Sequence, residues 1–331
     1  MGQKRALITG ISGQDGSYLA ELLLSKGYEV HGIVRKSTLE VKERLRNLSP
    51  VLDRLQLHAS SIENHLSLYK LISEIEPDEC YHLAASSFVS YDFDDEASII
   101  NINFNSTHFL LSCLKELSPQ CRFYFAGSSE MFGHADSSPQ NETTRFNPRS
   151  IYGISKLSSY HVVKNYREYH KMFACTGISY NHESPRRGLE YVTRKISSTA
   201  AKIFLGLADH LELGNLNAQR DWGYAPSYVE AMWRMLNQSE RPQDFVLATG
   251  QTHTIEELLK IAFENLDLDY KKYVRTDSKF FRPSEDTRLV GDASKARKLL
   301  DWQCDKSFET MIREMVDADL KRLKNQANSS N

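Results

Sequence analysis

A set of regularly spaced glycines near the N-terminus constrains the fold of this chain more than any other feature. The glycines separate a predicted strand at Arg5–Thr9 from a predicted helix at Ser17–Lys26. Gly10 permits a tight turn, Gly13 lets the backbone approach a pyrophosphate, and Gly16 allows close helix–strand packing. A phosphate would then lie at the helix N-terminus. The spacing therefore predicts a dinucleotide-binding loop, and the alternative is a glycine-rich turn that binds nothing.

Strand and helix patterns alternate through the first half of the chain. Further strands are predicted at Glu29–Val34, Gln56–Ala59, Glu79–Ala84, Cys121–Ala126 and Ala174–Tyr180. Helices are predicted at His65–Ile75, Asn105–Leu117 and Tyr152–His170, and later at Tyr228–Leu236, Ile255–Leu266 and from about Phe308. Such alternation favours a parallel sheet with helices on both faces. After about residue 181 the alternation gives way to shorter elements.

Charge and cysteine content exclude several classes of protein. The formal net charge is −2, so no global field recruits nucleic acid or an anionic membrane. The five cysteines are odd in number and form no CxxC pair, which favours reduced thiols over a disulfide framework or a zinc site. The N-terminal apolar run is too short for a signal sequence or a membrane span. We expect a cytoplasmic protein with no metal, nucleic-acid or membrane partner.

The residues after the second predicted strand indicate which nicotinamide cofactor binds. An acidic residue at this position would hold a ribose 2′-hydroxyl and repel a 2′-phosphate. The chain has Arg35, Lys36 and Ser37 there, two cations and a hydroxyl that suit a phosphate. We therefore expect NADP in preference to NAD. The alternative is that the two cations only begin a solvated loop.

A tyrosine and a lysine four residues apart form the candidate catalytic pair. Tyr152 and Lys156 would share one face of a helix, where the ammonium is expected to lower the pKa of the phenol. Ser128, at the end of the fifth predicted strand, would add a hydroxyl at the carboxyl edge of the sheet. A phenol with a lowered pKa is a usable base near neutral pH.

The chain resembles the extended short-chain dehydrogenase/reductases, because it has a glycine loop, then a hydroxyl, then a Tyr–Lys pair in this order. Over nearly its whole length it resembles the GDP-mannose 4,6-dehydratase family. The stretches that carry the resemblance are Leu7–Leu24, Asn181–Gly188, Val192–Ile196, Gly214–Trp222 and Arg282–Glu285. Asn181–Gly188 (NHESPRRG) followed by Val192–Ile196 (VTRKI) is the most specific of them.

The resemblance implies a reaction in which a GDP-sugar loses water and becomes a 4-keto-6-deoxy sugar. Tyr152 would take the C4 hydroxyl proton while hydride leaves for NADP⁺. Glu130 would remove the C5 proton, the C6 hydroxyl would leave as water, and hydride would return to C6. Glu130 lies two residues after Ser128, so both would face the same side if the segment is extended. The alternative is that Glu130 faces solvent or supports other residues.

The resemblance also implies the rest of the site. The expected catalytic residues are Ser128, Glu130, Tyr152 and Lys156. The expected cofactor-binding residues are Gly10, Gly13, Gln14, Asp15, Gly16, Arg35, Ser61, Ile62, Leu83, Ala84, Ala85, Ser87, Tyr152, Lys156, His182 and Arg187. The expected substrate-binding residues are Ser87, Ser129, Glu130, Asn181, Val192, Lys195, Arg220, Arg282 and Glu285. Self-association into a homodimer or homotetramer is expected from the family.

These observations lead us to expect an α/β fold: a Rossmann-type doubly wound parallel sheet with a smaller C-terminal α/β substrate-binding domain. Residues 1–180, with roughly 222–250, would form the NADP-binding domain. Residues 181–221 and 251–325 would bind the nucleotide sugar, and residues 326–331 would be a disordered tail.

Several positions depart from the family pattern and leave the sugar open. Ser60, Ser61 and Ile62 stand where the family has Gly-Asp-Leu, and Tyr224 and Ser227 stand where it has His and Asp. The sugar is therefore mannose, a heptose or another hexose. A second hypothesis is a GDP-sugar 4-oxidase, 4-epimerase or reductase, in which Glu130 has no role. A third is a non-catalytic NADP-binding or redox-sensing protein, which the intact Ser128, Tyr152 and Lys156 argue against.

Overall fold

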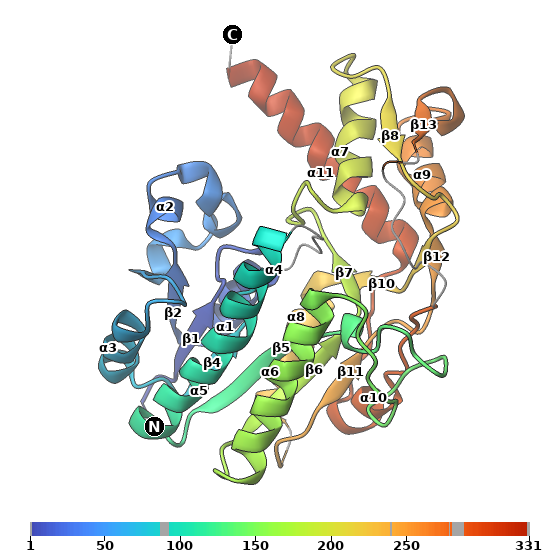
Figure 1. The fold of residues 1–331 in the computed structure, drawn as a ribbon. Helices are drawn as coiled ribbons and strands as arrows, with labels where there is room; N and C mark the ends of the chain where they lie inside the picture. Colours follow the sequence, from blue (N-terminus) through green and yellow to red (C-terminus); the bar gives the residue numbers. More distant parts are fainter. Residues whose placement is uncertain (1, 87–92, 239, 278, 280–287, 330–331) are drawn as a thin grey trace.

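The computed structural model describes residues 2–86, 93–238, 240–277, 279 and 288–329 and contains one large parallel sheet (Figure 1). The strands of this sheet are β1 (Arg5–Thr9), β2 (Glu29–Val34), β3 (Gln56–Ala59), β4 (Glu79–His82), β5 (Arg122–Ser128), β6 (Ala174–Ser179) and β11 (Phe245–Leu247). Their order is β11-β6-β5-β4-β1-β2-β3, and each neighbouring pair is parallel. The order reverses direction between β1 and β4, which places a topological switch point there.

Helices cover both faces of the sheet and build a second lobe. The helices are α1 (Gln14–Ser25), α2 (Lys36–Leu39), α3 (His65–Ile75), α4 (Phe93–Ile100), α5 (Ser106–Leu117), α6 (Ile151–Glu168), α7 (Val192–Phe204), α8 (Ala225–Asn237), α9 (Ile255–Glu264), α10 (Ser294–Leu300) and α11 (Phe308–Ser329). The remaining strands are β7 (Asn181–Glu183), β8 (Leu211–Leu213), β9 (Gln219–Arg220), β10 (Trp222–Tyr224), β12 (His253–Thr254) and β13 (Val274–Thr276), which pair in twos. Among the described residues, no helix combines the length and apolar character that a membrane span needs.

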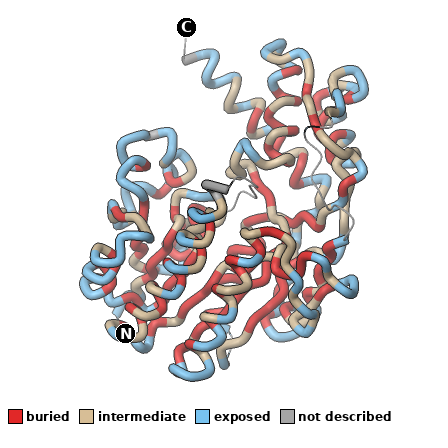
Figure 2. Tube along the Cα trace, in the orientation of Figure 1, coloured by how far each residue is buried: buried red, intermediate tan, exposed pale blue. Residues whose placement is uncertain are grey.

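The two faces of the sheet follow the two-residue period of its strands. In β1, Ala6 and Ile8 join the core formed with α1 and α8, whereas Leu7 joins the core formed with α3, α5 and α6. Figure 2 shows the buried segments concentrated along the strands, with exposed residues on the outer faces of the helices. A doubly wound sheet, buried on both faces, is the architecture predicted from the sequence.

A separate core lies beside the sheet. The helices α7, α9 and α11 pack with β8 around Ile196, Leu259, Phe263, Ile312 and Met315, all of which are buried. Figure 1 shows this group in the upper right of the view. The helical spacing of the apolar residues on α9 and α11 produces one buried stripe on each helix.

The predicted and observed elements differ mainly in short segments. The helix α1 begins at Gln14 instead of Ser17, because the last residues of the glycine loop form its first turn. The strand β11 and the helices α4 and α7 were not predicted. A strand of three residues is too short to show a periodic pattern. The helix α11 continues to Ser329, so the predicted tail at 326–331 is helical in its first four residues.

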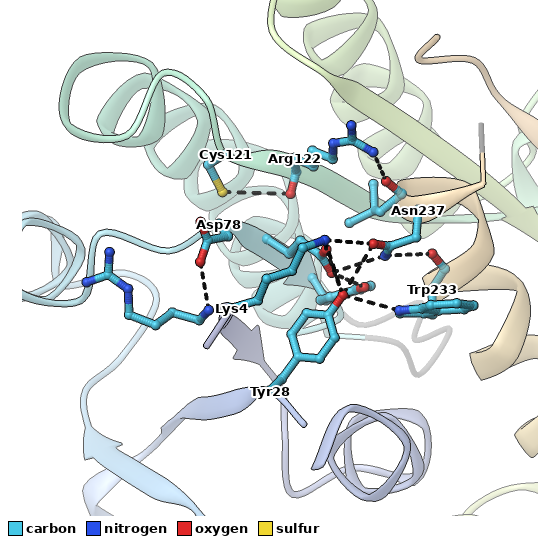
Figure 3. A network of polar contacts seen from close by, with 11 residues as sticks. Lys4, Tyr28, Asp78, Cys121, Arg122, Trp233 and Asn237 are labelled. Atoms are coloured by element: carbon cyan, nitrogen blue, oxygen red, sulfur yellow. Dashed lines mark hydrogen bonds and ion pairs between the residues drawn. The ribbon is translucent and has the colours of Figure 1, made fainter. Parts of the chain in front are cut away.

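A polar network at the amino-terminal end of β4 surrounds a buried carboxylate, and Figure 3 labels Lys4, Tyr28 and Asn237 within this network. The side chain of Glu79 is 1% exposed and accepts hydrogen bonds from Lys4 at 2.9 Å, Tyr28 at 2.9 Å and Tyr81 at 2.7 Å. Asn237 donates to it from the end of α8 at 3.3 Å. A buried carboxylate is tolerated only when donors surround it, as they do here.

We expect Glu79→Ala to destabilise the protein by about 3 kcal/mol, because the donors around the lost carboxylate would have no acceptor. Urea unfolding measured by circular dichroism tests this. Glu76→Ala is the matched control, since Glu76 is exposed and its contact with Arg5 is 3.7 Å long. Equal unfolding midpoints for the two variants would contradict the prediction.

Candidate active site

The glycine loop lies at the switch point, between the carboxyl ends of β1 and β4. Gly10 has φ +74°, and a side chain there would come within 2.9 Å of the Ala84 nitrogen. A Cβ on Gly16 would lie 2.6 Å from the Cα of Ile11 and would also meet the carbonyl oxygen of Gly10. These positions require glycine because the backbone segments touch.

The start of α1 fits a phosphate group. Gly13 occupies the N-cap position, and no side chain caps the helix there. The first amides of a helix have no intrahelical partners, and the helix dipole favours an anion at this end. The glycines that keep side chains out of this turn leave room for a pyrophosphate. The residues present therefore fit a dinucleotide cofactor.

Asp15 forms a partly buried ion pair with His182, which lies on β7. Oδ2 of Asp15 is 2.8 Å from Nε2 of His182, and Nδ1 of the imidazole lies 2.7 Å from the carbonyl oxygen of Tyr180. Burial alone would lower the pKa of His182, but the Asp15 carboxylate outweighs it and raises that pKa. The pKa of Asp15 is lowered in turn, because His182 overcomes the effect of burial. The ring of His182 also stacks on Tyr228 at 4.5 Å.

The candidate catalytic residues meet where β5 ends and α6 begins. Ser150 caps α6 by accepting a hydrogen bond from the Gly153 amide at 3.1 Å, which fixes the first turn that carries Tyr152. Ser128 hydrogen-bonds the phenol of Tyr152. Lys156 donates to the carbonyl oxygen of Ala126 at 2.8 Å. The structure therefore places Ser128, Tyr152 and Lys156 in one cluster.

The structure contradicts the prediction that Lys156 lowers the pKa of Tyr152. Burial raises the pKa of Tyr152, and the hydrogen bond from Ser128 and the charge of Arg187 oppose this only in part. The Lys156 nitrogen lies 5.9 Å from the phenol ring and points to Ala126 instead. Burial also lowers the pKa of Lys156 to about 8. Both groups therefore favour their neutral forms more than they do in water.

Glu130 lies beside Tyr152, but on a turn and not on an extended segment. It belongs to the 3-10 turn η4 (Ser129–Met131), and its amide donates to the Ser128 hydroxyl at 3.2 Å. The prediction that Ser128 and Glu130 share a face of a strand is therefore wrong. The Glu130 side chain lies 3.9 Å from Arg149 and is 27% exposed. A Cβ on Gly153 would come within 2.6 Å of the Glu130 carbonyl oxygen, so α6 and this turn are in direct backbone contact.

The sequence analysis missed a polar chain behind the catalytic helix. The Thr107 hydroxyl donates to the Asn103 carbonyl at 2.6 Å, so it accepts from Nε2 of His82, 3.0 Å away. Nδ1 of His82 then accepts from Thr9 at 2.8 Å. The Asn103 amide donates to the Ser155 hydroxyl at 3.0 Å, next to Lys156. Burial lowers the pKa of His82 to about 3, so the ring stays neutral.

Asn103 lies in a π-helical turn, η3 (Asn101–Asn105), and is buried. π-helical turns of this kind are frequent at functional sites. The available signal in the sequence was the run of three asparagines at alternate positions, Asn101, Asn103 and Asn105, within a helical segment.

The other predicted cofactor residues follow the strands of the sheet in order. Arg35 follows β2, Ser61 and Ile62 follow β3, and Leu83, Ala84 and Ala85 follow β4. Carboxyl ends of parallel strands share one edge of a sheet, so these residues lie on the same side as the glycine loop. Gln14 donates to the His182 carbonyl at 3.0 Å and accepts from Ser184 at 2.8 Å, so its side chain faces the protein.

The predicted substrate residues are divided between the sheet and the second lobe. Ser129 is buried beside Glu130, and Asn181 is the first residue of β7. Val192 begins α7, where Lys195 donates to the Glu212 carbonyl at 2.8 Å. Arg220 ends β9. The predicted site residues Ser87, Arg282 and Glu285 lie outside the described residues.

The sheet and its site define the class of protein. A Rossmann-type sheet with Ser128, Tyr152 and Lys156 at its carboxyl edge is the arrangement of the extended short-chain dehydrogenase/reductases. Solved structures agree on the fold. The UDP-glucose 4-epimerase from Thermotoga maritima superposes with a TM-score of 0.84 at 22% identity, over 96% of this chain and 99% of that one. RMD from Pseudomonas aeruginosa, complexed with NADPH, gives 0.82 at 22% identity, over 97% and 100%.

Sequence comparison resolves the family. The sequence model for GDP-mannose 4,6 dehydratase matches residues 7–315, so the chain belongs to that family. GDP-mannose 4,6 dehydratase 2 from Arabidopsis thaliana is 46% identical over 97% of this chain and 88% of its own length. GDP-mannose 4,6 dehydratase from Homo sapiens is 42% identical over 99% of this chain and 95% of its own.

We expect Lys156→Met to stabilise the cofactor-free protein at pH 7 by on the order of 1–3 kcal/mol, because it removes a buried ammonium. The native pKa of about 8 lies below the ordinary value of 10.5, so between these pH values the unfolded chain binds more protons. The free energy of unfolding of the wild type therefore rises as the pH increases from about 8 to 10.5. The stability advantage of Lys156→Met shrinks over the same range.

Thermal unfolding at pH 7 and pH 9.5 measures this difference. Lys164→Met, on the exposed side of the same helix, is the control and should show no pH-dependent gain. A melting temperature of Lys156→Met at or below that of the wild type at pH 7 would refute the prediction.

Proposed function

We propose that this protein is a nucleotide-sugar 4,6-dehydratase that converts GDP-mannose, or a close analogue, to the GDP-4-keto-6-deoxy sugar. The observation that carries the proposal is the contact between the Glu130 turn and the first turn of α6, which sets a carboxylate beside the Ser128–Tyr152–Lys156 group. An oxidoreductase without elimination needs the phenol and the lysine, but not this carboxylate. Membership in the family supports the same reaction.

The residues of the chain have separate parts in the proposed reaction. Tyr152 removes the proton of the C4 hydroxyl, and Ser128 orients the phenol through their hydrogen bond. Glu130 removes the proton at C5, which the new C4 ketone has made acidic, and passes it to the C6 hydroxyl, which leaves as water. A nicotinamide held by the glycine loop, Tyr152 and Lys156 would supply the hydride acceptor for C4 and the hydride donor for C6, so no cofactor would be consumed overall. The proton that Tyr152 took from the C4 hydroxyl would balance the protonation of C5.

We propose NADP as the cofactor. Arg35 is exposed immediately after β2, where a 2′-phosphate would lie, and Lys36 follows it. A guanidinium binds phosphate bidentately, whereas a carboxylate at this position would repel it. The glycine loop, Asp15, Ser61, Ile62, Leu83, Ala84, Ala85, Ser87, Lys156, His182 and Arg187 complete the proposed cofactor site.

We propose that the second lobe holds the nucleotide part of the substrate. Ser129, Asn181, Val192, Lys195, Arg220, Arg282 and Glu285 are the proposed contacts. Residues 1–180 and 222–250 would then form the cofactor domain, which agrees with α8 and β11 packing on the sheet side. A cytoplasmic location and self-association as a homodimer or homotetramer also remain proposals, and light scattering tests the second.

A GDP-sugar 4-oxidase, 4-epimerase or reductase is the second candidate. One observation favours it: the Glu130 carboxylate lies 3.9 Å from the Arg149 side chain, an ion pair that gives this carboxylate a partner without any catalytic role. The products separate the two candidates. A dehydratase product has lost one water, an epimerase product has unchanged mass, and a 4-oxidase product has lost two hydrogens.

We expect Glu130→Gln to form much less dehydrated product and to accumulate reduced cofactor, because C4 oxidation proceeds while elimination lacks its base. The rate of dehydration should fall about 10²–10⁴-fold. Mass spectrometry of products from a panel of GDP-sugars, with absorbance of the reduced nicotinamide, tests this. Glu190→Gln on the exposed turn before α7 is the control. Full dehydratase activity in Glu130→Gln would remove the carboxylate from the mechanism.

We expect Arg35→Ala to weaken NADP⁺ binding about 10–100-fold, through loss of a charge-assisted phosphate contact, and to leave NAD⁺ binding within about threefold. Isothermal titration of both cofactors measures the two constants. Lys70→Ala, an exposed cation on α3, should change neither. Equal weakening for NADP⁺ and NAD⁺ would show that Arg35 does not contact the 2′-phosphate.

A further inference from the structure

The segment 182–187, which we call the bridging segment, connects the sheet to the second lobe. On the sheet side it contacts α1. Gln14 donates to the His182 carbonyl at 3.0 Å, and Arg186 donates to Ser17 at 3.1 Å and to Glu21 at 2.5 Å. The glycine loop and the bridging segment are therefore one hydrogen-bonded unit.

On the other side, a buried arginine holds the bridging segment by its backbone. Arg194, on α7, donates to the carbonyl oxygen of Pro185 at 2.9 Å and to that of Arg187 at 2.7 Å. Its side chain is 1% exposed. Backbone carbonyls carry no full charge, so these contacts alone do not neutralise a buried guanidinium.

Asp319, on α11, supplies the missing charge. Its carboxylate accepts from Nε of Arg194 at 2.8 Å and from the terminal nitrogen Nη2 at 2.6 Å. Ser197 adds a hydrogen bond at 2.7 Å, and Arg322 bridges Asp319 and the Pro185 carbonyl. Asp319 is 2% exposed, so the pair is fully desolvated. Loss of either partner would leave an uncompensated buried charge.

The bridging segment ends in a residue that acts on the candidate catalytic tyrosine. Arg187 lies 3.2 Å from Glu183 and 3.5 Å above the ring of Tyr191, and its charge favours the ionised form of Tyr152. The other groups that face the phenol are Ser128, Glu130, Tyr191 and Lys156. Arg187 also lowers the pKa of Asp15, after His182. Its position therefore bears on both the phenol and the glycine loop.

We propose that Asp319 is a positioning residue: through Arg194 it holds the bridging segment against the start of α1, and with it the backbone of Arg187, whose side chain lies beside Glu183. A helix near the C-terminus thereby fixes a segment that borders the glycine loop. Asp319 touches neither the candidate catalytic residues nor the glycine loop. The kinetic and NADP⁺-binding consequences of this inference rest on the proposed function, whereas the hydrogen-exchange consequence does not.

Asp319→Asn is the test, because it keeps the shape of the side chain and removes its charge. Asp317→Asn is the matched control, since Asp317 is exposed on the same helix and contacts only Asn265 among the contacts described for it. Arg194→Lys keeps the cation, cannot make the bidentate contact, and serves as the second variant if Asp319→Asn does not fold. All variants are compared as full-length protein.

Hydrogen exchange of the cofactor-free protein is the first measurement. We expect amides of residues 184–191 to exchange about tenfold faster in Asp319→Asn, with α9 and β1 unchanged and Asp317→Asn like the wild type. Binding of NADP⁺ should weaken by about tenfold. Unchanged exchange in residues 184–191, or equal acceleration throughout the second lobe, would overturn the proposal and leave Asp319 with a purely structural role.

The pH dependence of kcat is the second measurement. We expect the ascending limb of the kcat profile to shift to a higher pH, by about one unit, in Asp319→Asn and Arg194→Lys. The reason is that the Arg187 cation would no longer counteract the rise that burial causes in the pKa of Tyr152. An unchanged limb, with exchange accelerated as expected, would overturn the link to the tyrosine. If the wild type dehydrates no GDP-sugar, the proposed function fails, while exchange and cofactor binding still decide the role of Asp319.

Discussion

The close backbone contact at the switch point is the constraint on which the rest of the structure depends. Gly10 lies against Ala84, and Gly16 lies against Gly10 and Ile11, so β1, β4 and α1 are brought together without side chains between them. This places an uncapped helix N-terminus at the carboxyl edge of the sheet. The Asp15–His182 pair then attaches the loop to β7, and the bridging segment continues that attachment into the second lobe.

Burial shapes the chemistry of the site as much as the identity of its residues does. Removal from water raises the pKa of Tyr152 and lowers that of Lys156, so each group resists its charged form in the free protein. Among the described residues, Arg187 is the cation whose charge favours the ionised phenol. Since the backbone of Arg187 is held by Arg194, the ion pair with Asp319 becomes part of the electrostatics of the site.

The buried carboxylates of Glu79 and Asp319 both connect distant elements, but they have different hydrogen-bond donors. Glu79 joins β4 to the N-terminal strand and to α8 at the edge of the sheet away from the site, and its donors are mostly neutral. Asp319 joins α11 to α7 and is paired with arginine. Both satisfy the requirement that a desolvated carboxylate be surrounded by donors. Only the second lies within reach of the segment that borders the candidate active site.

The sequence by itself determined the doubly wound sheet, the glycine loop and the Ser128, Tyr152 and Lys156 group, because these depend on local periodicity and on short spacings. The first three predicted strands of the sheet have the bounds observed. Residues whose role depends on distant partners were missed: His82, Asn103, Arg194 and Asp319 each contact elements far away in the chain. Tertiary packing decided the turn at Glu130 and the raised pKa of Tyr152. The contact between α6 and the end of β5 fixes the backbone direction at Glu130 and removes the Tyr152 phenol from water. Spacing along a chain fixes which groups can share a face, whereas charge states depend on how completely the fold removes those groups from water.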